Sequence, residues 1–459
     1  MTKGNSNFVT NARISKQVRL DAAMVFFFIA TFRLPQLLSP ASNLLISLTI
    51  AALLAVYAGF IVFRNKFVIK HVSKPRLLLV VLYLGLELLS FMRAGIEQSL
   101  DSYTVLKTSG LIITLSIFMF FSISNMRSKE DLFFFMRVVF YGFVVLALEN
   151  LFLYLVGIGS FQTGTEYSIS SLGVLTSALG LEVIAATFGL EAAPKALGSM
   201  LIFLVAASII FLREGKNNVI FVLTLIFCSG MIVASDARFY SVMILLLVTI
   251  SVIHKKLVSK KILKLYLLFY PLIPLLLLVI ASFVADLPGF DIVSRNASDN
   301  ISTLSNRTLI WAAIGDEILE ANIQLVHGYG AAGTVNSGIN SEIAFVFVGG
   351  WENTGVKTAH NSIFQVLLDK GLIGVLVLLA LLRSLLMTYR SSDSPESRAF
   401  LYGLLALMLS STINTLFHYA GVESYALFLI LVGIHLSTFF DHENSDEKLI
   451  GVSIRENHL

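Results

Sequence analysis

Charged residues are scarce in this chain of 459 residues. Asp, Glu, Lys and Arg make up 14% of the sequence, whereas a soluble globular domain carries roughly 25% charge. Hydrophobic residues make up 56% and fall in long apolar runs. The composition therefore excludes a soluble globular protein. It indicates a polytopic membrane protein, because about 20 consecutive apolar residues form a helix that spans a bilayer.

The chain also has only one cysteine, a small net charge and no evident signal-peptide cleavage site. The single cysteine, Cys228, excludes an intrachain disulfide and is expected to be a small core residue. The net charge of +4 is small and the basic residues are scattered, so we expect no nucleic-acid partner. The first apolar stretch, near Leu20, has no small-residue cleavage site, so we expect a signal anchor that stays in place.

The apolar runs predict an all-α polytopic membrane protein with about twelve transmembrane helices in a single membrane-embedded domain, residues 1–459. We find no internal repeat. The predicted helices cover residues 20–38, 44–63, 77–92, 105–123, 132–157, 196–213, 218–234, 238–253, 263–285, 361–389, 399–417 and 423–440.

The loop charges predict the orientation of the chain. Most of the 33 Lys and Arg residues fall in cytoplasmic segments if the N-terminus is inside, with Lys370 counted among the outer charges. We therefore expect both termini to be cytoplasmic, including a polar, disordered tail of residues 441–459. Arg33, Arg137 and Arg383 fall within predicted spans, and the sequence assigns them no role.

The largest polar insert in this apolar chain is the segment 286–359, between the ninth and tenth predicted helices. The predicted topology places it outside the membrane, together with the smaller segment 158–195. Its glycine-rich middle predicts tight turns rather than a separate soluble domain. We expect an extracytoplasmic loop with short helices that carries part of a functional site.

Two arginines are expected at this outer side. Arg238 opens the eighth predicted helix, and Arg307 opens a short amphipathic helix that carries Trp311 on the same face. We expect that helix to lie on the membrane surface, with Arg307 facing a cavity. Arginine recognises phosphate through paired, planar hydrogen bonds. Taken singly, each arginine is also explained as a headgroup anchor or as a salt-bridge partner, for example Arg238 with Asp236.

His360 begins the tenth predicted helix, at its outer end. The partial positive charge of a helix N-terminus disfavours an imidazolium, so we expect His360 to be neutral and available as a base near pH 7. Asn361, Gln365 and Asp369 follow at four-residue steps and form a polar stripe. Asp369 lies so deep that we expect it to have a partner. The plainer interpretation of His360 is an interfacial capping residue.

One base and two cations suit the transfer of a sugar chain from a polyprenyl pyrophosphate to a hydroxyl. Pyrophosphate leaves without a proton, so the enzyme needs a base for the acceptor and cations for the leaving group. A glycosidase needs a pair of carboxylates instead, and no outer pair stands out. His327 and His360 have no evident third ligand, so we expect neither a metal ion nor another cofactor.

Three segments resemble the O-antigen polymerase/ligase superfamily of bacterial envelopes, and the resemblance spans roughly residues 190–440. The third segment is the most specific. Asp236 departs from the ligases, which usually have small residues there. The segments are Ser235-Asp236-Ala237-Arg238; Asn306-Arg307-Thr308-Leu309-Ile310-Trp311 with His327-Gly328-Tyr329-Gly330; and His360-Asn361-Ser362-Ile363 with Asp369-Lys370-Gly371-Leu372-Ile373-Gly374.

The resemblance implies a GT-C-like membrane glycosyltransferase of the bacterial cytoplasmic (inner) membrane with its active site on the extracytoplasmic face. It implies that Arg238 and Arg307 bind the pyrophosphate of an undecaprenyl-pyrophosphate-linked oligosaccharide donor. His360 would activate the hydroxyl of the glycan acceptor, and Trp311, Asn361 and Asp369 would support the site. A chain-length regulator and a flippase are the implied protein partners.

Three functions stay open. A polysaccharide polymerase, which we expect, transfers the glycan onto another lipid-linked repeat unit. A ligase transfers it to lipid A-core or to another acceptor such as a protein. A polysaccharide transporter or flippase is the third, because charges such as Glu87 and Glu149 fall within or near spans. Transporter sites usually lie at the membrane midplane between repeats, however, whereas the residues singled out above gather at the outer surface.

Overall fold

The chain is helical in the part that the structure, a computed structural model, describes. The described residues contain no strand, and one isolated antiparallel bridge joins Val72 and Ser437. The described ranges are 14–31, 40–64, 70–97, 99–156, 194–215, 218–235, 238–253, 259–276, 279, 307–320, 323–343, 358–416 and 422–440.

Each predicted apolar run overlaps a helix, so the all-helical class is confirmed. Four helices in the described part, α3, α4, α5 and α16, are long and apolar enough to cross a membrane, whereas the number of spans stays a prediction. The helices are α1 (Lys16–Thr31), α2 (Pro40–Arg64), α3 (Lys74–Ile96), α4 (Ser102–Ser124), α5 (Lys129–Leu155), α7 (Pro194–Arg213), α8 (Val219–Ala234), α9 (Arg238–Ile253), α10 (Lys260–Phe269), α16 (Ser362–Ser391), α17 (Pro395–Ser410) and α18 (Val422–His435).

Polar caps and prolines fix several helix ends. The Ser128 hydroxyl accepts a hydrogen bond from the Asp131 amide at 3.3 Å, and Ser394 accepts one from the Ser397 amide at 3.0 Å. The predicted helix 263–285 is different in the structure. It begins earlier, at Lys260, and passes at Phe269 into the 3₁₀ turn η3 (Tyr270–Leu272), where Pro271 has no amide hydrogen to donate.

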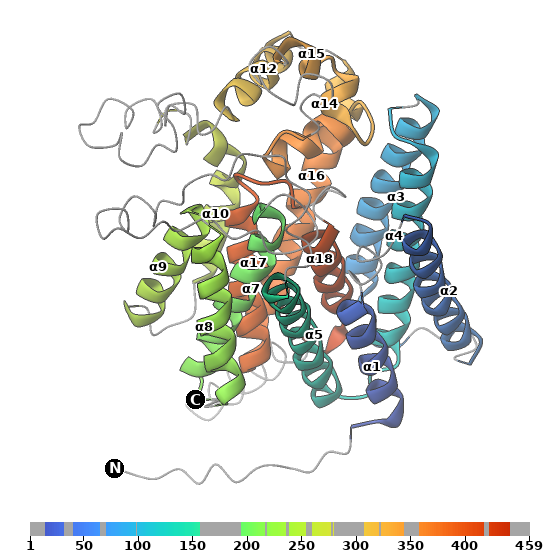
Figure 1. Cartoon of the computed structure of the whole chain (residues 1–459), viewed down its shortest axis with the longest axis vertical. Coiled ribbons are helices and arrows are strands. Elements are labelled where there is room, and N and C mark those ends of the chain that lie inside the picture. The colour runs from blue at the N-terminus through green and yellow to red at the C-terminus, as the bar shows by residue number, and fades with distance from the viewer. Residues whose placement is uncertain are drawn as a thin grey trace, which may run out of the picture.

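Helix α7 forms the centre of the bundle. Every residue from Leu197 to Phe211 is buried, as expected for a helix that is apolar on all sides. Helices α5, α8, α17 and α18 surround it, while α1 to α4 lie toward one edge of the molecule (Figure 1). Gly403 of α17 permits close packing here, because a Cβ atom at this position would lie 2.4 Å from the Phe203 ring.

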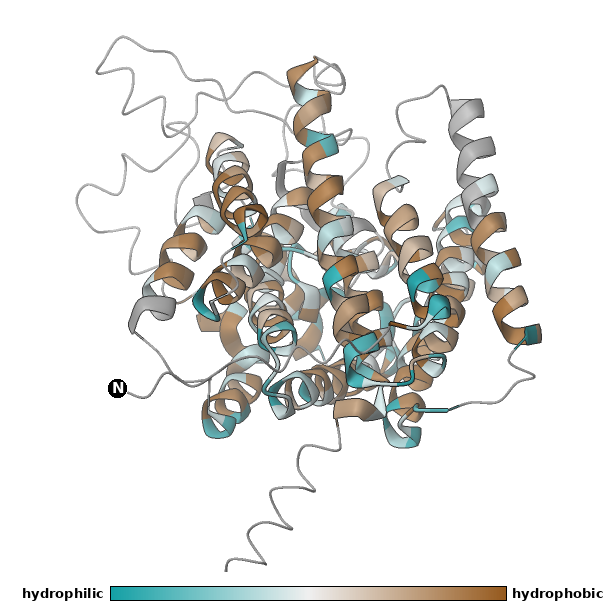
Figure 2. Ribbon diagram, turned by 90° about the horizontal axis from the view of Figure 1, so that it is seen from below, coloured by the Kyte–Doolittle hydropathy of each residue, from teal (hydrophilic) through white to brown (hydrophobic). Residues whose placement is uncertain are grey.

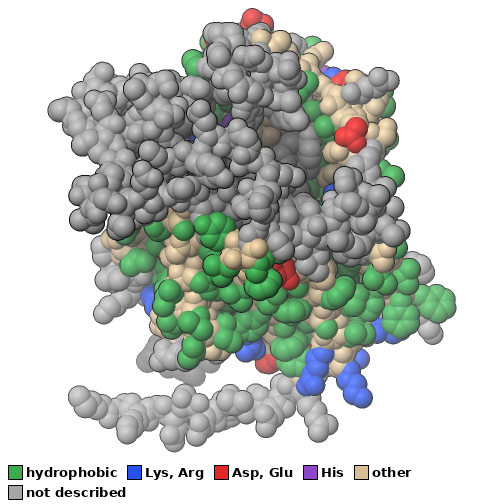
Figure 3. Space-filling model, in the orientation of Figure 1, with side chains coloured by type: hydrophobic (Ala, Val, Ile, Leu, Met, Phe, Trp, Pro, Cys, Tyr) green, Lys and Arg blue, Asp and Glu red, His purple; other side chains and the backbone are tan. Residues whose placement is uncertain are grey.

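The surface of the bundle is apolar. Hydrophobic residues dominate the helices seen from below (Figure 2), and hydrophobic side chains cover the visible lower half of the molecule (Figure 3). Lys and Arg side chains gather at the lower edge of that region (Figure 3). Val219 is 68% exposed and Ile226 is 63% exposed on α8 alone. A surface of this kind marks a membrane-embedded protein, since apolar patches this large are rare in water.

A small cap of residues 307–343 covers one end of the bundle, at the top of Figure 1. It contains α12 (Arg307–Leu319), α13 (Gln324–His327), α14 (Gly333–Asn336) and α15 (Ile339–Ile343). The described part of the insert therefore contains short helices, whereas the extracytoplasmic loop as a whole stays a prediction. Residues 286–306 and 344–357 of the insert lie outside the described residues, as do the segment 158–193 and the tail 441–459.

Candidate functional site

His360 lies in a turn with left-handed backbone. Its φ is +50°, a region that residues other than glycine rarely adopt. His360 precedes the N-cap residue Asn361, so it stands directly before the N-terminal end of α16. The side chain is half-buried between Ala359 and Asn361, which are both fully buried.

Hydrogen bonds hold the backbone on the N-terminal side of His360. The indole Nε1 of Trp311 donates to the Ala359 carbonyl at 2.9 Å. The Ala359 amide donates to Oε1 of Gln365 at 2.8 Å. Both polar groups of Ala359 are therefore bound to side chains of other elements. A residue in a sparsely populated conformation persists only where its surroundings hold it in this way.

The residues after His360 dock α16 on the end of α17. Asn361 caps α16 by accepting a hydrogen bond from the Phe364 amide at 3.0 Å, and its Nδ2 donates to the Thr412 carbonyl at 2.7 Å. The Ser362 hydroxyl donates to the Asn414 carbonyl at 2.9 Å. Asn361 is thus a buried structural residue beside His360.

A buried hydroxyl cluster joins this junction to α9, two residues after Arg238. The Tyr240 hydroxyl lies 2.6 Å from the Ser199 hydroxyl and 2.9 Å from that of Ser410, and it accepts a hydrogen bond from Nδ2 of Asn414. These partners come from α7, α17 and the turn after α17. The cluster fixes the start of α9 against the elements that also hold the His360 turn.

Arg307 reaches the same region from the cap. It is half-buried at the first residue of α12, where its charge interacts with the Tyr240 hydroxyl. The buried face of α12 packs on protein, since Trp311 contacts Phe364 at a ring distance of 6.2 Å. Ile318, seven residues after Trp311 on the same side of α12, is 40% exposed, so the buried apolar face ends near Ile314.

The starts of α9, α12 and α16 therefore lie at the same end of the bundle, because Arg307 interacts with Tyr240 of α9 and Trp311 of α12 bonds to Ala359 just before α16. Arg238, Arg307 and His360 stand at or next to these three starts. The side chain of Arg238 and the residue Asp236, its salt-bridge partner in the plainer interpretation, lie outside the described part of the chain. An arginine and the N-terminus of a helix each favour an anion, and Arg307 stands at the first residue of α12.

Asp369 has the partner that its depth predicts. Its Oδ1 accepts hydrogen bonds from the Gly333 amide at 2.9 Å and from Nε2 of Gln365 at 2.8 Å. Because Gln365 also binds Ala359, the predicted polar stripe forms a continuous chain from the His360 turn to the cap. Asp369 therefore attaches the cap to α16.

The cap binds to α16 at a break in this helix. Gly371 has φ of +68° and ψ of −170°, so the predicted continuous helix is wrong at this point. The break leaves carbonyls of the preceding turn unpaired within the helix. The Tyr329 amide donates to the Leu368 carbonyl at 2.6 Å, and the Gly330 amide donates to the Asp369 carbonyl at 3.0 Å. The amides of the Gly328-Tyr329-Gly330 segment therefore satisfy the carbonyls that the break in α16 leaves unpaired.

Tyr329 and Arg93 fasten this segment further. Burial and a hydrogen bond to the Glu317 carboxylate raise the pKa of Tyr329 well above its ordinary value, so the phenol stays a hydrogen-bond donor at neutral pH. Arg93 of α3 donates to the Gly328 carbonyl and pairs with Glu97 at 2.7 Å. The cap is thus attached to α3 as well as to α16.

Lys370, which the sequence counts among the outer charges, is buried inside the protein. Lys370 forms an ion pair with Glu87 of α3, and each side chain is only 2% exposed. Its ammonium also lies 5.2 Å from the centre of the Tyr83 ring. A buried lysine has to be paired, and the deep acid Glu87 is the sequence signal that points to it.

The comparisons with known proteins give no family for this chain. No family model matches it, and no curated protein matches it. Within the described ranges, no three His, Cys, Asp or Glu side chains gather as metal ligands, and the expectation of a metal-free site stays a prediction.

Proposed function

We propose that this protein is a membrane glycosyltransferase that uses an undecaprenyl-pyrophosphate-linked glycan donor. One observation carries the proposal: Arg307, the start of α9 at Arg238, and the His360 turn meet at one end of an apolar bundle. A base beside an anion-binding region is what transfer from a lipid pyrophosphate needs. The segments that resemble the O-antigen polymerase/ligase superfamily contain these same residues.

The proposed reaction has one chemical step. His360 accepts the proton of the acceptor hydroxyl while the hydroxyl oxygen bonds to the anomeric carbon of the donor glycan. The bond between that carbon and the pyrophosphate oxygen breaks, and the electron pair leaves on the polyprenyl pyrophosphate. The imidazolium then releases the proton to water. A positioned base contributes roughly 100- to 10,000-fold to such a step.

The arginines have the complementary role. Negative charge develops on the leaving pyrophosphate, so Arg238 and Arg307 stabilise the transition state together with the N-termini of α9 and α12. No cofactor takes part in this proposal. Trp311 holds α12 against the His360 turn through its bond to the Ala359 carbonyl, and it supports the catalytic geometry without touching the reacting atoms.

The proposed location is the bacterial cytoplasmic membrane, with about twelve spans, both termini cytoplasmic and the site on the extracytoplasmic face. The distribution of Lys and Arg along the sequence supports this orientation. The substrates also support it, because a polyprenyl-linked glycan stays in the membrane and an apolar bundle gives it lateral access.

A deletion strain analysed for surface glycan and for lipid-carrier intermediates tests the proposal. A polymerase, the function we favour, leaves a single repeat unit on the final acceptor when it is lost. A ligase leaves full-length polymer on the lipid carrier. Unchanged surface glycans and unchanged carrier intermediates would contradict both forms of the proposal.

One observation favours a second candidate, a polysaccharide transporter. Helix α16 is broken at Gly371, beside the buried Lys370–Glu87 pair, and transporters often bind substrates at broken helices. Here protein backbone fills the break, because a Cβ atom on Gly371 would lie 2.4 Å from the Val326 carbonyl. A transporter is the correct assignment if the deletion strain accumulates single carrier-linked units on the cytoplasmic leaflet.

A further inference from the structure

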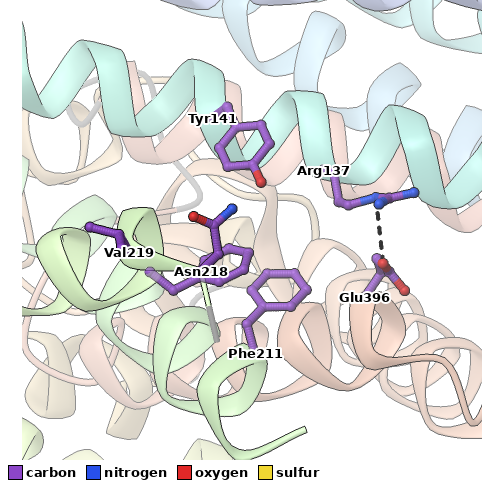
Figure 4. A pocket seen from close by; sticks show the side chains of 7 residues that line it. Arg137, Tyr141, Phe211, Asn218, Val219 and Glu396 are labelled. Carbon is purple, nitrogen blue, oxygen red and sulfur yellow. Dashed lines mark ion pairs between the residues drawn. The ribbon is translucent and has the colours of Figure 1, made fainter. Parts of the chain in front are cut away.

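A second candidate site lies at the opposite end of the bundle. A cavity of about 430 Å³ opens between the first half of α5, the end of α7 and the starts of α8 and α17. The His360 site lies at the other ends of α8 and α17, so the two sites are separate. The cavity is lined by Arg137, Tyr141, Phe211, Asn218, Val219, Phe221 and Glu396 (Figure 4).

The cavity contains one cation and one anion. Nε of Arg137 lies 3.5 Å from Oε1 of Glu396, which is longer than a strong arginine–carboxylate hydrogen bond. The Arg137 side chain is 43% exposed, whereas that of Glu396 is 6% exposed. The guanidinium of Arg137 on α5 and the carboxylate of Glu396 on α17 face each other across the gap between these two helices (Figure 4). This loose pair leaves room for a ligand to interact with both charges.

Aromatic rings and one amide form the rest of the lining. Phe211 and Phe221 stack with ring centroids 4.5 Å apart, and the Tyr141 ring lies parallel to Phe221. Asn218 caps α8 through its Oδ1 atom, and its amide lies beneath the Tyr141 hydroxyl (Figure 4). The lining is therefore half polar and half apolar, with rigid aromatic walls.

We propose that this cavity binds the zwitterionic headgroup of an aminophospholipid. The ligand's phosphate binds Arg137, and its ammonium binds Glu396, so the half-exposed guanidinium and the buried carboxylate each keep an opposite partner. A purely anionic headgroup meets Glu396 as a like charge, and a purely cationic ligand meets Arg137 in the same way. The exposed apolar residues Val219 and Leu223 of α8 beside the cavity suit the acyl chains.

The position of the cavity agrees with this ligand. It lies at helix ends of the bundle, the level at which lipid headgroups surround a membrane protein. A primary ammonium carries three hydrogen-bond donors and no acceptor, which matches the Glu396 carboxylate of the lining. The proposal does not depend on the transfer reaction, because the candidate catalytic residues are at the far end of the bundle.

Lipid binding to the purified full-length protein in detergent tests the proposal. Native mass spectrometry and thermal unfolding follow titration with phosphatidylethanolamine, phosphatidylglycerol and free phosphoethanolamine. We expect phosphatidylethanolamine to bind most tightly and to raise the melting temperature, because a ligand of the folded state stabilises it. Equal or tighter binding of phosphatidylglycerol overturns the zwitterion assignment, and equal binding of free phosphoethanolamine overturns the lipid assignment.

Charge-removing variants locate the site. We expect Arg137→Gln and Glu396→Gln each to weaken phosphatidylethanolamine binding by about tenfold, as for the loss of one charge-assisted hydrogen bond. Arg383→Gln is the matched control, because Arg383 is an exposed arginine outside the cavity. Its separation from the end of α16 at Ser391 equals the separation of Arg137 from the start of α5 at Lys129. Equal effects of all three variants would contradict the proposal.

A steric variant tests the cavity without removing a charge, in case Glu396→Gln fails to fold. Val219→Trp places a large ring in the cavity from a position that is 68% exposed. Ile220→Trp, at the next residue and outside the lining, is its control. We expect loss of phosphatidylethanolamine binding in Val219→Trp alone. Unchanged binding in Val219→Trp overturns the proposal.

Discussion

At the scale of single residues, the account depends on a turn that the chain adopts at a cost. Left-handed backbone costs a residue with a Cβ atom roughly 1–2 kcal/mol. His360 adopts it between Ala359 and Asn361, which form buried hydrogen bonds with Trp311, Gln365 and Thr412. The free energy for holding His360 therefore comes from buried hydrogen bonds of its neighbours. A side chain placed in this way is suited to a base that acts in one geometry.

Arg307→Lys tests whether the planar guanidinium matters. An ammonium keeps the charge but cannot form the paired hydrogen bonds that arginine makes with phosphate. We expect transfer activity to fall by about tenfold or more, since a hydrogen bond to a charged group contributes about 1.5–3 kcal/mol. Glycan transfer by the purified enzyme measures this, with Arg383→Lys as the control. Activity equal to wild type would reduce Arg307 to an anchor of α12.

Some of the site's residues follow from the sequence, and others do not. The partner of Asp369 is predictable, because a carboxylate deep in an apolar helix has to be satisfied and Gln365 stands one turn away. Tyr240 is not predictable. Nothing marks it among the 14 tyrosines of the chain, and its hydroxyl partners come from α7 and α17. These contacts join segments that are distant in the sequence, so the spacing of residues along the chain does not predict them.

At the scale of elements, the break in α16 connects the bundle to the cap. The apolar pattern of residues 362–391 continues across Gly371, and a glycine inside such a run is common in membrane helices. The sequence therefore predicts one continuous span. The break depends on the Gly328-Tyr329-Gly330 segment, whose amides donate hydrogen bonds to the carbonyls released by the break. The pattern of residues 362–391 alone does not predict it. The apolar pattern favours a continuous helix here, whereas the docked Gly328-Tyr329-Gly330 segment stabilises a break. The structure contains the break.

Gly371→Ala tests the break. A Cβ atom there would lie 2.4 Å from the Val326 carbonyl, on a backbone with φ of +68°. We expect a lower melting temperature in detergent and faster proteolysis of the cap, because left-handed backbone alone costs a residue with a Cβ atom roughly 1–2 kcal/mol. Gly85→Ala is the control, because its Cβ atom meets nothing within 4 Å in the middle of α3. Equal stability of both variants would show that the break is dispensable.

The Lys370–Glu87 pair joins the same break to α3. Removing one partner leaves a buried charge uncompensated, which costs about 3–5 kcal/mol. We therefore expect Glu87→Gln and Lys370→Met each to lower the melting temperature strongly. The double variant should recover most of the loss, because neither charge remains. If the two effects simply add, the pair is not coupled and the ammonium has another partner.

At the scale of the whole molecule, an apolar bundle holds a capped polar site at one end and a zwitterionic cavity at the other. The helical class follows from hydrophobic periodicity, since each predicted run overlaps a helix. The orientation follows from loop charge alone and stays a prediction. The position of the cap follows from neither, because it depends on backbone hydrogen bonds between the insert and α16.

Cysteine labelling tests the orientation. The native Cys228 is fully buried, so we expect it to give little background labelling by an impermeant maleimide added to intact cells. We expect Ile323→Cys, at an exposed site in the cap, to react from outside. We expect Glu130→Cys, at the start of α5, to react only after the membrane is permeabilised. The reverse pattern would place the candidate site in the cytoplasm and exclude the proposed substrates.

The transfer activity of His360→Asn tests the central claim most directly. Asparagine tolerates left-handed backbone, so the turn and the docking of α16 should be preserved while the base is lost. The measurement is glycan transfer from a polyprenyl-pyrophosphate donor by purified protein, with the melting temperature as a check on folding. The account predicts an activity about 100-fold or more below wild type at an unchanged melting temperature. Wild-type activity in a folded His360→Asn protein would contradict it.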